Sequence, residues 1–529
     1  KTGEELKNLL RQIDHKSYKA YKEVKGIYRM PGYVLAVDHV QGDPFAAPSR
    51  LHIQVAGRAA RIPGNLYDSK CKKMAVADYL LRNFAKQLER YSFQAHGSGK
   101  SGIIQVTRCG QEVLERTACE IEEKTGNIIV RFEVGFPARG RTIQAGELIK
   151  ILYQYLPACV EKALYYKNMD QNAVKRAAEL AVDQEYIREQ LKKEGLIAFV
   201  ADGAILPRES GVSQRPMKDA VPFVSPDSMK VTMKLPYKGV LTGMGIRKGI
   251  TLVVGGGYHG KSTLLKALES GVYPHIAGDG REYVVTDDTA MKIRAEDGRS
   301  IRHTDISMFI NDLPNGKDTY AFDTEDASGS TSQAANVIES MEAGTQVFLI
   351  DEDTSATNFM VRDELMQQVI HRDMEPITPF IERVRDLYQE YGISTVLVAG
   401  SSGAYFQIAD QIIQMDKYVP REITELAKKA ASDYPALKFP EEKPEQPSFD
   451  RKVRKNPGIR QKGRVKLKTM GCDAVMIGHE TIDLRYVEQL VDSEQLMALG
   501  YLLNYAHWGR SYVSWKRRYL MAGRHLDRP

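Results

Sequence analysis

Apolar and polar positions follow a mixed helical and strand pattern up to about residue 225. Leu6, Leu9, Leu10 and Ile13 recur at helical spacing and predict an amphipathic helix within residues 2–24. Further elements are predicted in the order strand, strand, helix, helix at Tyr33–Val40, Leu51–Val55, Cys71–Tyr91 and Gln111–Glu122. We expect a mixed α/β domain over residues 1–225.

The pattern then changes to short apolar runs that are typical of buried strands, and changes again after residue 430. Ile250–Val254 and Val347–Ile350 are continuous apolar runs, which favours a second α/β domain over residues 226–430. Residues 431–529 begin with a proline-rich linker and continue with a basic segment. Apolar residues at helical spacing then predict a C-terminal helix at Ile482–Leu499.

A glycine-rich loop joins the strand Ile250–Val254 to a helical segment at Leu264–Leu268. Its sequence, GGGYHGKST, fits the phosphate-binding pattern G-x-x-x-x-G-K-[ST]. Backbone N–H groups of such a loop point at phosphates, and the helix N-terminus adds positive potential. We expect Lys261 to reach the β- and γ-phosphates and Ser262 to help hold Mg²⁺. The predicted nucleotide-binding residues here are Gly255, Gly256, Gly257, Tyr258, His259, Gly260, Lys261, Ser262 and Thr263.

A second glycine-rich loop, GSGKSG, lies at residues 97–102. Gln94 takes the place of the first glycine of the phosphate-binding pattern, and the residues that follow are strand-like rather than helical. An ordinary turn is therefore favoured. The alternative is an anion-binding nest, since glycine N–H groups lie beside Lys100.

The run VFLIDE at Val347–Glu352 predicts a buried strand that ends in two acids. Asp351 would hold Mg²⁺, and Glu352 would orient the attacking water. Phosphoryl transfer requires mainly positioning and charge neutralisation, so this small set suffices. The alternative is a core strand that ends in solvated acids, which the preceding phosphate loop disfavours.

Longer stretches resemble a known family. LIDEDTSATN at 349–358 resembles the ABC ATPase pattern LLDEPTSALD, and SGSTSQ at 328–333 lies where ABC proteins carry the signature LSGGQ. IRAEDGR, DASGSTSQAA and IDEDTSATNF, together with FPARGR, LPRESG and DPFAAPSR in the N-terminal part, are similar to the predicted ATPases of the ABC class over most of residues 30–420. The resemblance implies an ABC-type ATPase that uses ATP/ADP and Mg²⁺. In ABC dimers a signature closes over the nucleotide of the opposite subunit, which implies a homodimer here. The signature residues that would contact nucleotide are Ser328, Gly329, Ser330 and Gln333.

The sequence departs from common ABC proteins at three places. Ser401, within GSSG, occupies the position of the switch histidine. Glu296 is the nearest candidate for the Q-loop glutamine, and Tyr237 is a weak candidate for stacking on adenine. We therefore expect ATP hydrolysis to be slow or the γ-phosphate to be handled differently.

Composition limits the compartments in which the protein could act but does not identify one. The net charge of +6 is mild for 529 residues, and the five cysteines form no CxxC pair, which favours a reducing compartment. No apolar run reaches the length of a membrane span. The first residue is Lys1, which is compatible with a removed targeting peptide.

Positive charge gathers in Arg451–Lys468, which holds nine Lys and Arg residues and no acid. An aromatic and basic stretch that includes Trp508 and Trp515 follows it, and such a combination suits phosphate contact with base stacking. The basic segment and tail resemble the kinetoplastid mitochondrial RNA-editing accessory member of the family, which implies mitochondrial localisation in a ribonucleoprotein complex. The predicted RNA contacts are Arg451, Lys452, Arg454, Lys455, Arg460, Lys462, Arg464, Lys466 and Lys468.

Three other interpretations remain open at this stage. The basic run could be a solvated charged surface. The chain could be an ATP-gated assembly protein whose basic run contacts an acidic protein surface. A small-molecule kinase is the weakest alternative, because a kinase needs neither the SGSTSQ signature nor the loop that follows Asp351.

Overall fold

The computed structural model describes residues 1–363, 365, 369–370, 374–437, 439, 443–449, 451 and 467–508, the last five without their side chains. The chain forms two compact units. Unit 1 comprises residues 1–185 and 236–238, and unit 2 comprises residues 186–235 and 239–529. The division falls within helix α6 (Gln171–Lys193). The three-part division predicted from the sequence stays a prediction beside this partition.

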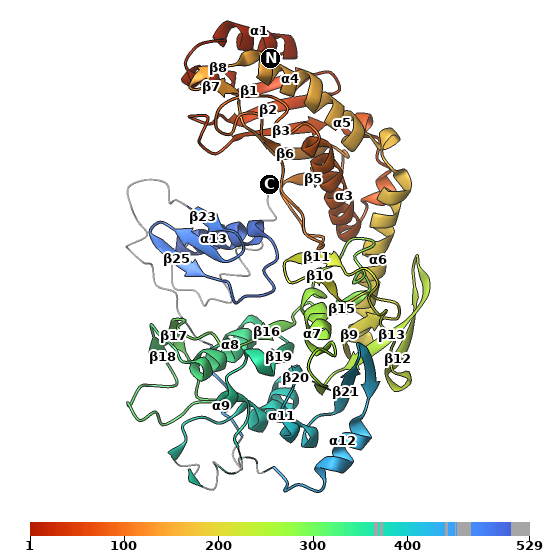
Figure 1. Cartoon of the computed structure of the whole chain (residues 1–529), viewed down its shortest axis with the longest axis vertical. Helices are drawn as coiled ribbons and strands as arrows, with labels where there is room; N and C mark the ends of the chain where they lie inside the picture. The colour runs from red at the N-terminus through yellow and green to blue at the C-terminus, as the bar shows by residue number, and fades with distance from the viewer. Residues whose placement is uncertain are drawn as a thin grey trace. The chain divides into compact units, whose positions relative to one another are not determined.

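Unit 1 is a layer of helices on an antiparallel sheet. The sheet order is β1-β2-β3-β6-β4, and β5 pairs with β6. Alternate residues of β3 are buried, so the sheet places one face against the helices, as its period-two pattern requires. Figure 1 shows α1, α4, α5 and α3 along the sheet. The strands are β1 (Gly26–Met30), β2 (Tyr33–His39), β3 (Ser49–Val55), β4 (Ile104–Gln105), β5 (Cys119–Ile121), β6 (Ile128–Val134), β7 (Ala138–Arg139) and β8 (Thr142–Ile143), and the helices are α1 (Gly3–Ile13), α2 (Gly57–Ala60), α3 (Lys70–Glu89), α4 (Ala145–Lys150) and α5 (Leu156–Leu164).

The helix predicted at residues 111–122 is wrong. Residues 111–118 are irregular, and the segment ends in strand β5 on β6. Arg82 on α3 donates to the carbonyl oxygen of Gly110 at 2.5 Å and to that of Glu112 at 3.0 Å. Arg116 is itself buried and donates to Asp78 Oδ1 at 2.8 Å. These contacts satisfy the backbone of an irregular segment, so its helix propensity is overridden.

Unit 2 contains a mostly parallel sheet in the order β16-β19-β20-β14-β21-β22, in which only β22 is antiparallel. Every residue of β19 and β20 is buried, as expected of central strands covered on both faces. The predicted strand Ile250–Val254 is confirmed as β14. The other strands are β16 (Met291–Ile293), β19 (Val347–Asp351), β20 (Ser394–Val398), β21 (Gln411–Asp416) and β22 (Val419–Glu422), and the helices near the sheet are α7 (Lys261–Ser270), α8 (Gly329–Ala343), α9 (Thr357–Met360), α11 (Phe380–Tyr391) and α12 (Thr424–Ala431).

Smaller sheets complete unit 2. An antiparallel sheet has the order β12-β13-β9-β15, with the bounds Lys230–Leu235, Gly239–Arg247, Leu196–Ala201 and Val284–Thr286. Two hairpins pair β10 (Arg208–Ser210) with β11 (Ser213–Pro216), and β17 (Ile301–Thr304) with β18 (Phe322–Thr324).

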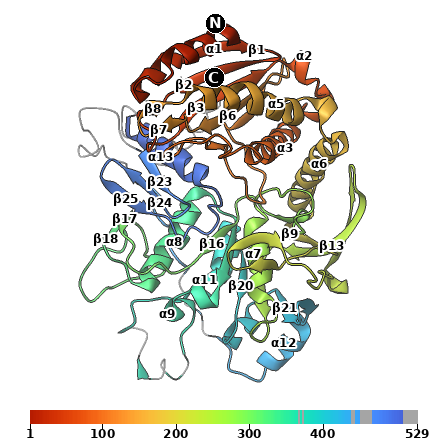
Figure 2. The same ribbon diagram turned by 45° about the horizontal axis from the view of Figure 1, so that its top comes forward.

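The C-terminal part, blue in Figure 2, is a three-stranded meander with one helix. It consists of β23 (Leu467–Met470), β24 (Ala474–Ile477), β25 (Glu480–Asp483) and α13 (Ser493–Trp508). The helix predicted at 482–499 is therefore wrong over its first part. Asp492 ends the turn segment, since its Oδ1 accepts the N–H of Glu494 at 2.9 Å. Among the described helices, none combines the length and the hydropathy that a bilayer crossing requires.

Candidate functional site

Three loops of unit 2 leave the parallel sheet at the same edge. They follow β14, β19 and β20, which are parallel neighbours with Val253 and Asp351 both opposite Val398. Because parallel strands end together, the glycine-rich loop, the Asp351–Glu352 pair and the GSSG loop all lie at this edge. Figure 1 shows α7, which begins at Lys261, next to β19 and β20.

The glycine-rich loop is shaped by two glycines with positive φ and close neighbours. Gly255 has φ +145°, and a Cβ atom there would lie 2.4 Å from the carbonyl oxygen of Met415. Gly260 has φ +98°, and its Cβ would lie 2.7 Å from the Tyr418 ring. No N–H of residues 256–260 donates to another group within the described chain. The loop therefore presents unpaired donors in front of a helix N-terminus, the arrangement that binds phosphate.

Lys261 and Ser262 are the first residues of α7 and face the loop and the adjacent strand end. Lys261 Nζ donates to the carbonyl oxygens of Gly255 and Gly256 at 2.7 and 2.9 Å. Ser262 Oγ donates to Asp351 Oδ2 at 3.4 Å. A hydroxyl and a carboxylate oxygen are hard ligands of the kind that Mg²⁺ prefers, so the two side chains fit the ion predicted for them.

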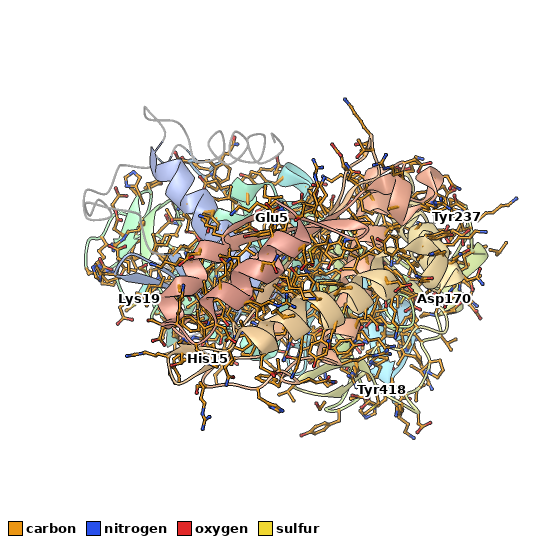
Figure 3. The ribbon with its side chains drawn as sticks, turned by 90° about the horizontal axis from the view of Figure 1, so that it is seen from above. Glu5, His15, Lys19, Asp170, Tyr237 and Tyr418 are labelled. Atoms are coloured by element: carbon orange, nitrogen blue, oxygen red, sulfur yellow. The ribbon has the colours of Figure 1, made fainter. Side chains whose placement is uncertain are left out.

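Tyr258 and His259 lie at the tip of the loop and differ in their surroundings. His259 Nδ1 accepts the N–H of Lys417 at 2.9 Å, and its carbonyl oxygen accepts the N–H of Tyr418 at 3.0 Å. His259 thus ties the loop to the β21–β22 turn, where Tyr418 stands at the surface in Figure 3. Tyr258 has φ +64° and is 99% exposed, so its ring is available to a ligand or partner and is not packed within the described part of the chain.

Glu352 is held by the loop that follows β20. The Ser401 hydroxyl donates to Glu352 Oε1 at 2.6 Å, and the N–H groups of Gly400 and Ser401 donate to Oε2 at 2.6 and 3.0 Å. Burial alone would raise the pKa of Glu352, but these hydrogen bonds outweigh it and lower the pKa. The carboxylate is therefore kept ionised, as a group that polarises water must be. Sequence reasoning placed Ser401 as a substitute for histidine and missed the Gly400 N–H.

The residues of the SGSTSQ signature divide between the start of α8 and its buried interior. Ser328 caps the helix and accepts the N–H of Thr331 at 3.4 Å, and it is exposed. Gln333 is fully buried and bonds with both ends of its amide to the loop after Asp351, donating to Ser355 Oγ at 3.0 Å and accepting the Ala356 N–H at 2.8 Å. Gln333 therefore links the signature to the loop after Asp351 within one chain, and Ser328 remains accessible.

Glu296 lies beside the same helix. Its N–H donates to Ser332 Oγ at 2.8 Å, and its Oε1 accepts from Asn336 at 3.2 Å. Burial raises the pKa of Glu296, against the opposing effect of Arg299. Ser332, fully buried, is a contact that the sequence reasoning missed, because the signature pattern gives its second half no structural role.

Other predicted residues are placed elsewhere or lie outside the described residues. Tyr237 belongs to unit 1 and is 49% exposed. Arg451 donates to Glu342 Oε2 at 2.9 Å and lies 3.3 Å from Glu339, so its guanidinium is paired within unit 2. Lys468 lies on β23 and is exposed. The remaining basic positions, Lys452, Arg454, Lys455, Arg460, Lys462, Arg464 and Lys466, are outside the described residues, as is Trp515.

Comparisons with known proteins give matches along nearly the whole chain. A family model described as ATPase of the ABC class N-terminal matches residues 3–167. A second, the P-loop domain of the ABC ATPases, matches residues 170–451, which is over half of the chain. A third, described as the MRB1590 C-terminal domain, matches residues 466–522.

One curated relative and several solved structures are similar over part of the chain. The uncharacterized protein MJ1628 of Methanocaldococcus jannaschii is 28% identical over 264 residues, which cover 48% of this chain and 57% of that protein. The chain thus matches little more than half the length of this relative. MJ1267, an ATP-binding cassette of an ABC transporter in its ADP conformation, is 12% identical over 45% of this chain and 95% of its own, with a TM-score of 0.27. CbiO1 from Clostridium perfringens, part of the ABC transporter complex cbiONQ, is 13% identical over 43% of this chain and 87% of its own, also with a TM-score of 0.27.

Proposed function

This chain belongs to the ATPases of the ABC class, and we propose that it binds ATP with Mg²⁺ and hydrolyses it. The observation that supports this most is the convergence of the glycine-rich loop, Asp351 and the Ser401–Glu352 pair at one sheet edge. The free N–H groups of residues 256–260 would hold the phosphates, and Lys261 would turn from the loop carbonyls to the β- and γ-phosphates. Ser262 and Asp351 would hold Mg²⁺, which when bound neutralises phosphate charge. Glu352, kept ionised, would polarise the attacking water.

We further propose that two copies form a head-to-tail homodimer that shares two ATP sites. Ser328 is exposed at the start of a 15-residue helix whose N-terminus would favour a γ-phosphate, while Gln333 anchors this end to the loop after Asp351. Sedimentation of Glu352→Gln with ATP tests the dimer, since ATP that cannot be hydrolysed should hold it closed. Lys261→Ala with ATP is the matched control and should stay monomeric. A monomeric Glu352→Gln protein under the same conditions would contradict the proposal.

ATP binding is proposed to be coupled to RNA binding by the C-terminal part. The support is a set of contacts within unit 2 that join the segment before α13 to the ATPase core. Gln489 accepts the N–H of Lys292 at 3.0 Å and donates to the carbonyl oxygen of Ala290 at 3.0 Å. It also donates to the carbonyl oxygen of Glu269, near the end of the helix that begins at Lys261.

A second set of contacts reaches the loop that carries Glu296. Arg294 pairs with Glu488, and its guanidinium lies 4.4 Å from the centre of the Tyr486 ring. Arg294 is two residues from Glu296, which bonds to α8 through Ser332. A shift of either core element on nucleotide binding would therefore act directly on the segment that carries the C-terminal sheet. No motif in the sequence predicted these contacts of Gln489 and Tyr486.

The RNA step is tested by ATP turnover with and without single-stranded RNA, comparing wild type with Lys261→Ala. RNA affinity is tested by salt titration of a variant with Lys452, Arg454 and Lys455 changed to Ala, which should weaken binding and reduce the salt dependence. Arg451 is left unchanged because its guanidinium is already paired. Unchanged RNA affinity would contradict the RNA assignment and favour the ATP-gated assembly protein. Residues 466–522 match the family model of the MRB1590 C-terminal domain, and the tail resembles the kinetoplastid mitochondrial RNA-editing accessory member of the family. We therefore propose that the protein acts in a mitochondrial ribonucleoprotein complex.

A further inference from the structure

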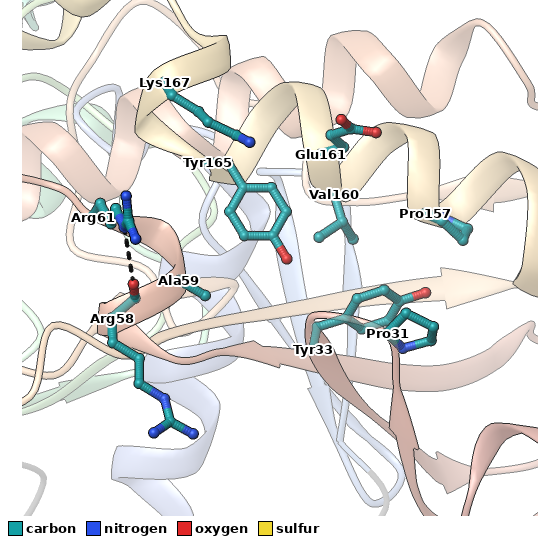
Figure 4. A pocket seen from close by; sticks show the side chains of 10 residues that line it. All are labelled: Pro31, Tyr33, Arg58, Ala59, Arg61, Pro157, Val160, Glu161, Tyr165 and Lys167. Atoms are coloured by element: carbon teal, nitrogen blue, oxygen red, sulfur yellow. Dashed lines mark hydrogen bonds between the residues drawn. The ribbon is translucent and has the colours of Figure 1, made fainter.

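A cavity of about 500 Å³ opens in unit 1, separate from the residues discussed so far. It lies among the β1–β2 turn, the short helix α2 and the end of α5, and Figure 4 shows its walls. We call it the Tyr33 pocket. It is lined by Pro31, Tyr33, Arg58, Ala59, Arg61, Pro157, Val160, Glu161, Tyr165 and Lys167.

Backbone features fix two walls of the pocket. Gly32 has φ +85°, and its carbonyl oxygen accepts a hydrogen bond from the Tyr165 hydroxyl at 3.0 Å. A Cβ atom at Gly32 would lie 2.4 Å from that hydroxyl, so glycine is required for the contact. On the other side, Gly57 at the start of α2 donates its N–H to Asn127 Oδ1 at 3.0 Å. The pocket is thus bounded by elements tied down on both sides.

The charge of the lining favours an anion. It contains three cations, Arg58, Arg61 and Lys167, and one acid, Glu161. Arg61 Nε donates to the carbonyl oxygen of Arg58 at 3.4 Å, and none of the three cations takes part in an ion pair within the part of the chain that the structure describes. In Figure 4 the Lys167 ammonium lies above the Tyr165 ring and Arg61 lies to the left of it, whereas Arg58 extends downward, away from the ring. Arg61 and Lys167 are therefore the pair best placed to hold one anionic group.

The remaining surface is apolar and aromatic. Pro31, Pro157 and Val160 line it together with the rings of Tyr33 and Tyr165. Tyr33 is 5% exposed, and its hydroxyl has no hydrogen-bond partner among the described residues. Because this hydroxyl is itself shielded from solvent, Tyr33 forms the floor of the pocket, and the less buried Tyr165 ring is the aromatic surface open to a ligand.

We propose that the Tyr33 pocket binds a nucleoside monophosphate unit, with the phosphate on Arg61 and Lys167 and the base against the Tyr165 ring. A flat ring with an anionic group matches the two halves of the lining, aromatic rings stack on bases, and a cavity of this size accommodates a small ligand. The unit is either a free mononucleotide or one nucleotide of an RNA strand.

Titration of AMP into the full-length protein tests the proposal. The phosphate loop is first saturated with Mg²⁺ and a non-hydrolysable ATP analogue, so that AMP reports only on another site. One AMP per chain should bind, and Arg61→Asn/Lys167→Gln should weaken binding about tenfold or more. Asn is chosen at position 61 because Arg61 has φ +55°, a conformation that Asn tolerates. The matched control is Lys19→Ala/Lys22→Ala, which removes two charges from the surface of the same unit, where Figure 3 labels Lys19, and should bind AMP as wild type does.

Two further measurements keep the test decisive if the double variant folds poorly. Ala59→Trp fills the pocket, keeps all its charges and should abolish AMP binding. In unmodified protein, AMP should slow chemical acetylation of Lys167 and leave that of Lys19 unchanged. No AMP binding, or AMP binding that neither pocket variant weakens, would overturn the proposal.

Other ligands distinguish a nucleotide from simple phosphate, and an RNA strand from a free nucleotide. Inorganic phosphate that binds as tightly as AMP would overturn the assignment of a nucleoside. A 5′-phosphorylated oligouridylate that competes with AMP would assign an RNA strand, and AMP binding without such competition would assign a free nucleotide. Lys261→Ala should leave AMP binding intact, so failure of this site and failure of the proposed ATPase are distinguishable.

Discussion

The chain contains two glycine-rich loops with the letters Gly-Lys-Ser, and the structure uses them in opposite ways. Residues 255–263 follow strand β14 and lead into helix α7, whereas residues 97–102 come after a helix and lead into strand β4. The first loop has free N–H groups at residues 256–260 within the described chain. In the second loop most backbone N–H groups donate to carbonyl oxygens of unit 1.

Three backbone N–H groups of residues 97–102 are bonded to backbone carbonyls of two neighbouring loops. The N–H groups of Ser98, Lys100 and Gly102 donate to Ala138, Pro44 and Gly135 at 2.7, 2.8 and 2.9 Å. The Ser98 hydroxyl accepts the N–H of Gly140 at 2.9 Å. Ser101 also donates its N–H to the carbonyl oxygen of Ser98 at 3.2 Å, so within this loop only Gly97 and Gly99 have N–H groups without a partner among the described residues. The ordinary turn favoured by the sequence is the arrangement found. A glycine-rich loop can bind phosphate only where its N–H groups are left unpaired.

Removing the two lysines in turn should give the largest difference between the loops. Lys261→Ala removes the cation proposed to contact the transferred phosphate, so ATP turnover should fall by about 10²-fold or more. Lys100→Ala removes the same residue from the same letters and should change turnover less than about twofold. Steady-state ATPase measurements on both variants decide. Equal losses would mean that the loop at 97–102 also serves the nucleotide.

The two loops should respond oppositely to a methyl group on glycine. Gly102 has φ +77°, and a Cβ atom there would lie 1.9 Å from the backbone oxygen of Ala95, which cannot move independently. Gly102→Ala should therefore lower the free energy of unfolding by at least about 2 kcal/mol, measured by denaturant titration. At Gly260 the nearest atoms belong to the Tyr418 side chain, which can rotate, so Gly260→Ala should cost less stability and more ATP affinity. A stable Gly102→Ala protein would refute the structural role of this turn.

The local sequence pattern correctly predicted elements whose neighbouring segments support the same assignment. The phosphate loop is identified because a strand precedes it and a helix follows, and the run VFLID is a strand because it is buried along its whole length. The helix at 111–122 could not be rejected from sequence, because Arg82 and Asp78, which hold that segment irregular, lie some 30 residues earlier. The local helical pattern was real and was overridden by distant contacts.

The site was predicted as a set of residues and only partly as a set of contacts. Ser401 was identified by its position after a strand, but nothing in GSSG indicates that two N–H groups and a hydroxyl converge on Glu352. The signature pattern predicted that Gln333 contacts the nucleotide. In the structure both ends of its side-chain amide are hydrogen-bonded to the loop after Asp351. Hydrogen bonds between loops depend on strand order, which a single sequence does not specify.

The neighbours of the phosphate loop include Glu352, a carboxylate that the loop after β20 keeps ionised. Ser401→Ala removes a hydrogen bond that lowers the pKa of Glu352, so that pKa should rise. The acid limb of ATP turnover should then shift to higher pH, with a loss of a few-fold near neutral pH. A depressed pKa stabilises the fold above the unfolded value and loses this contribution as pH falls through the folded value.

The stability difference between wild type and Ser401→Ala should follow the same sign. It should be about 1 kcal/mol near neutral pH, because the pair is partly exposed, and should vanish in acid once Glu352 is protonated. Denaturant titrations at several pH values measure it, and Ser402→Ala is the control in the same loop. A stability difference that persists unchanged in acid would show that Ser401 acts through packing instead.

The smallest expected change in stability and ATP affinity concerns His259, which holds the phosphate loop in place while the loop's N–H groups stay unpaired. His259 anchors the tip by accepting the Lys417 N–H with its side chain, so the loop is fixed through an imidazole nitrogen and its carbonyl oxygen rather than through its donors. His259→Ala leaves that N–H without its partner and should cost about 1 kcal/mol of stability, with ATP affinity reduced a few-fold by the looser tip. Tyr258→Ala, which removes a ring that is 99% exposed, should leave stability unchanged and serves as the control for the same measurement. If His259→Ala changed neither thermal stability nor ATP affinity, the anchor would be dispensable, and the rigidity of the loop would rest on Gly255 and Gly260 alone.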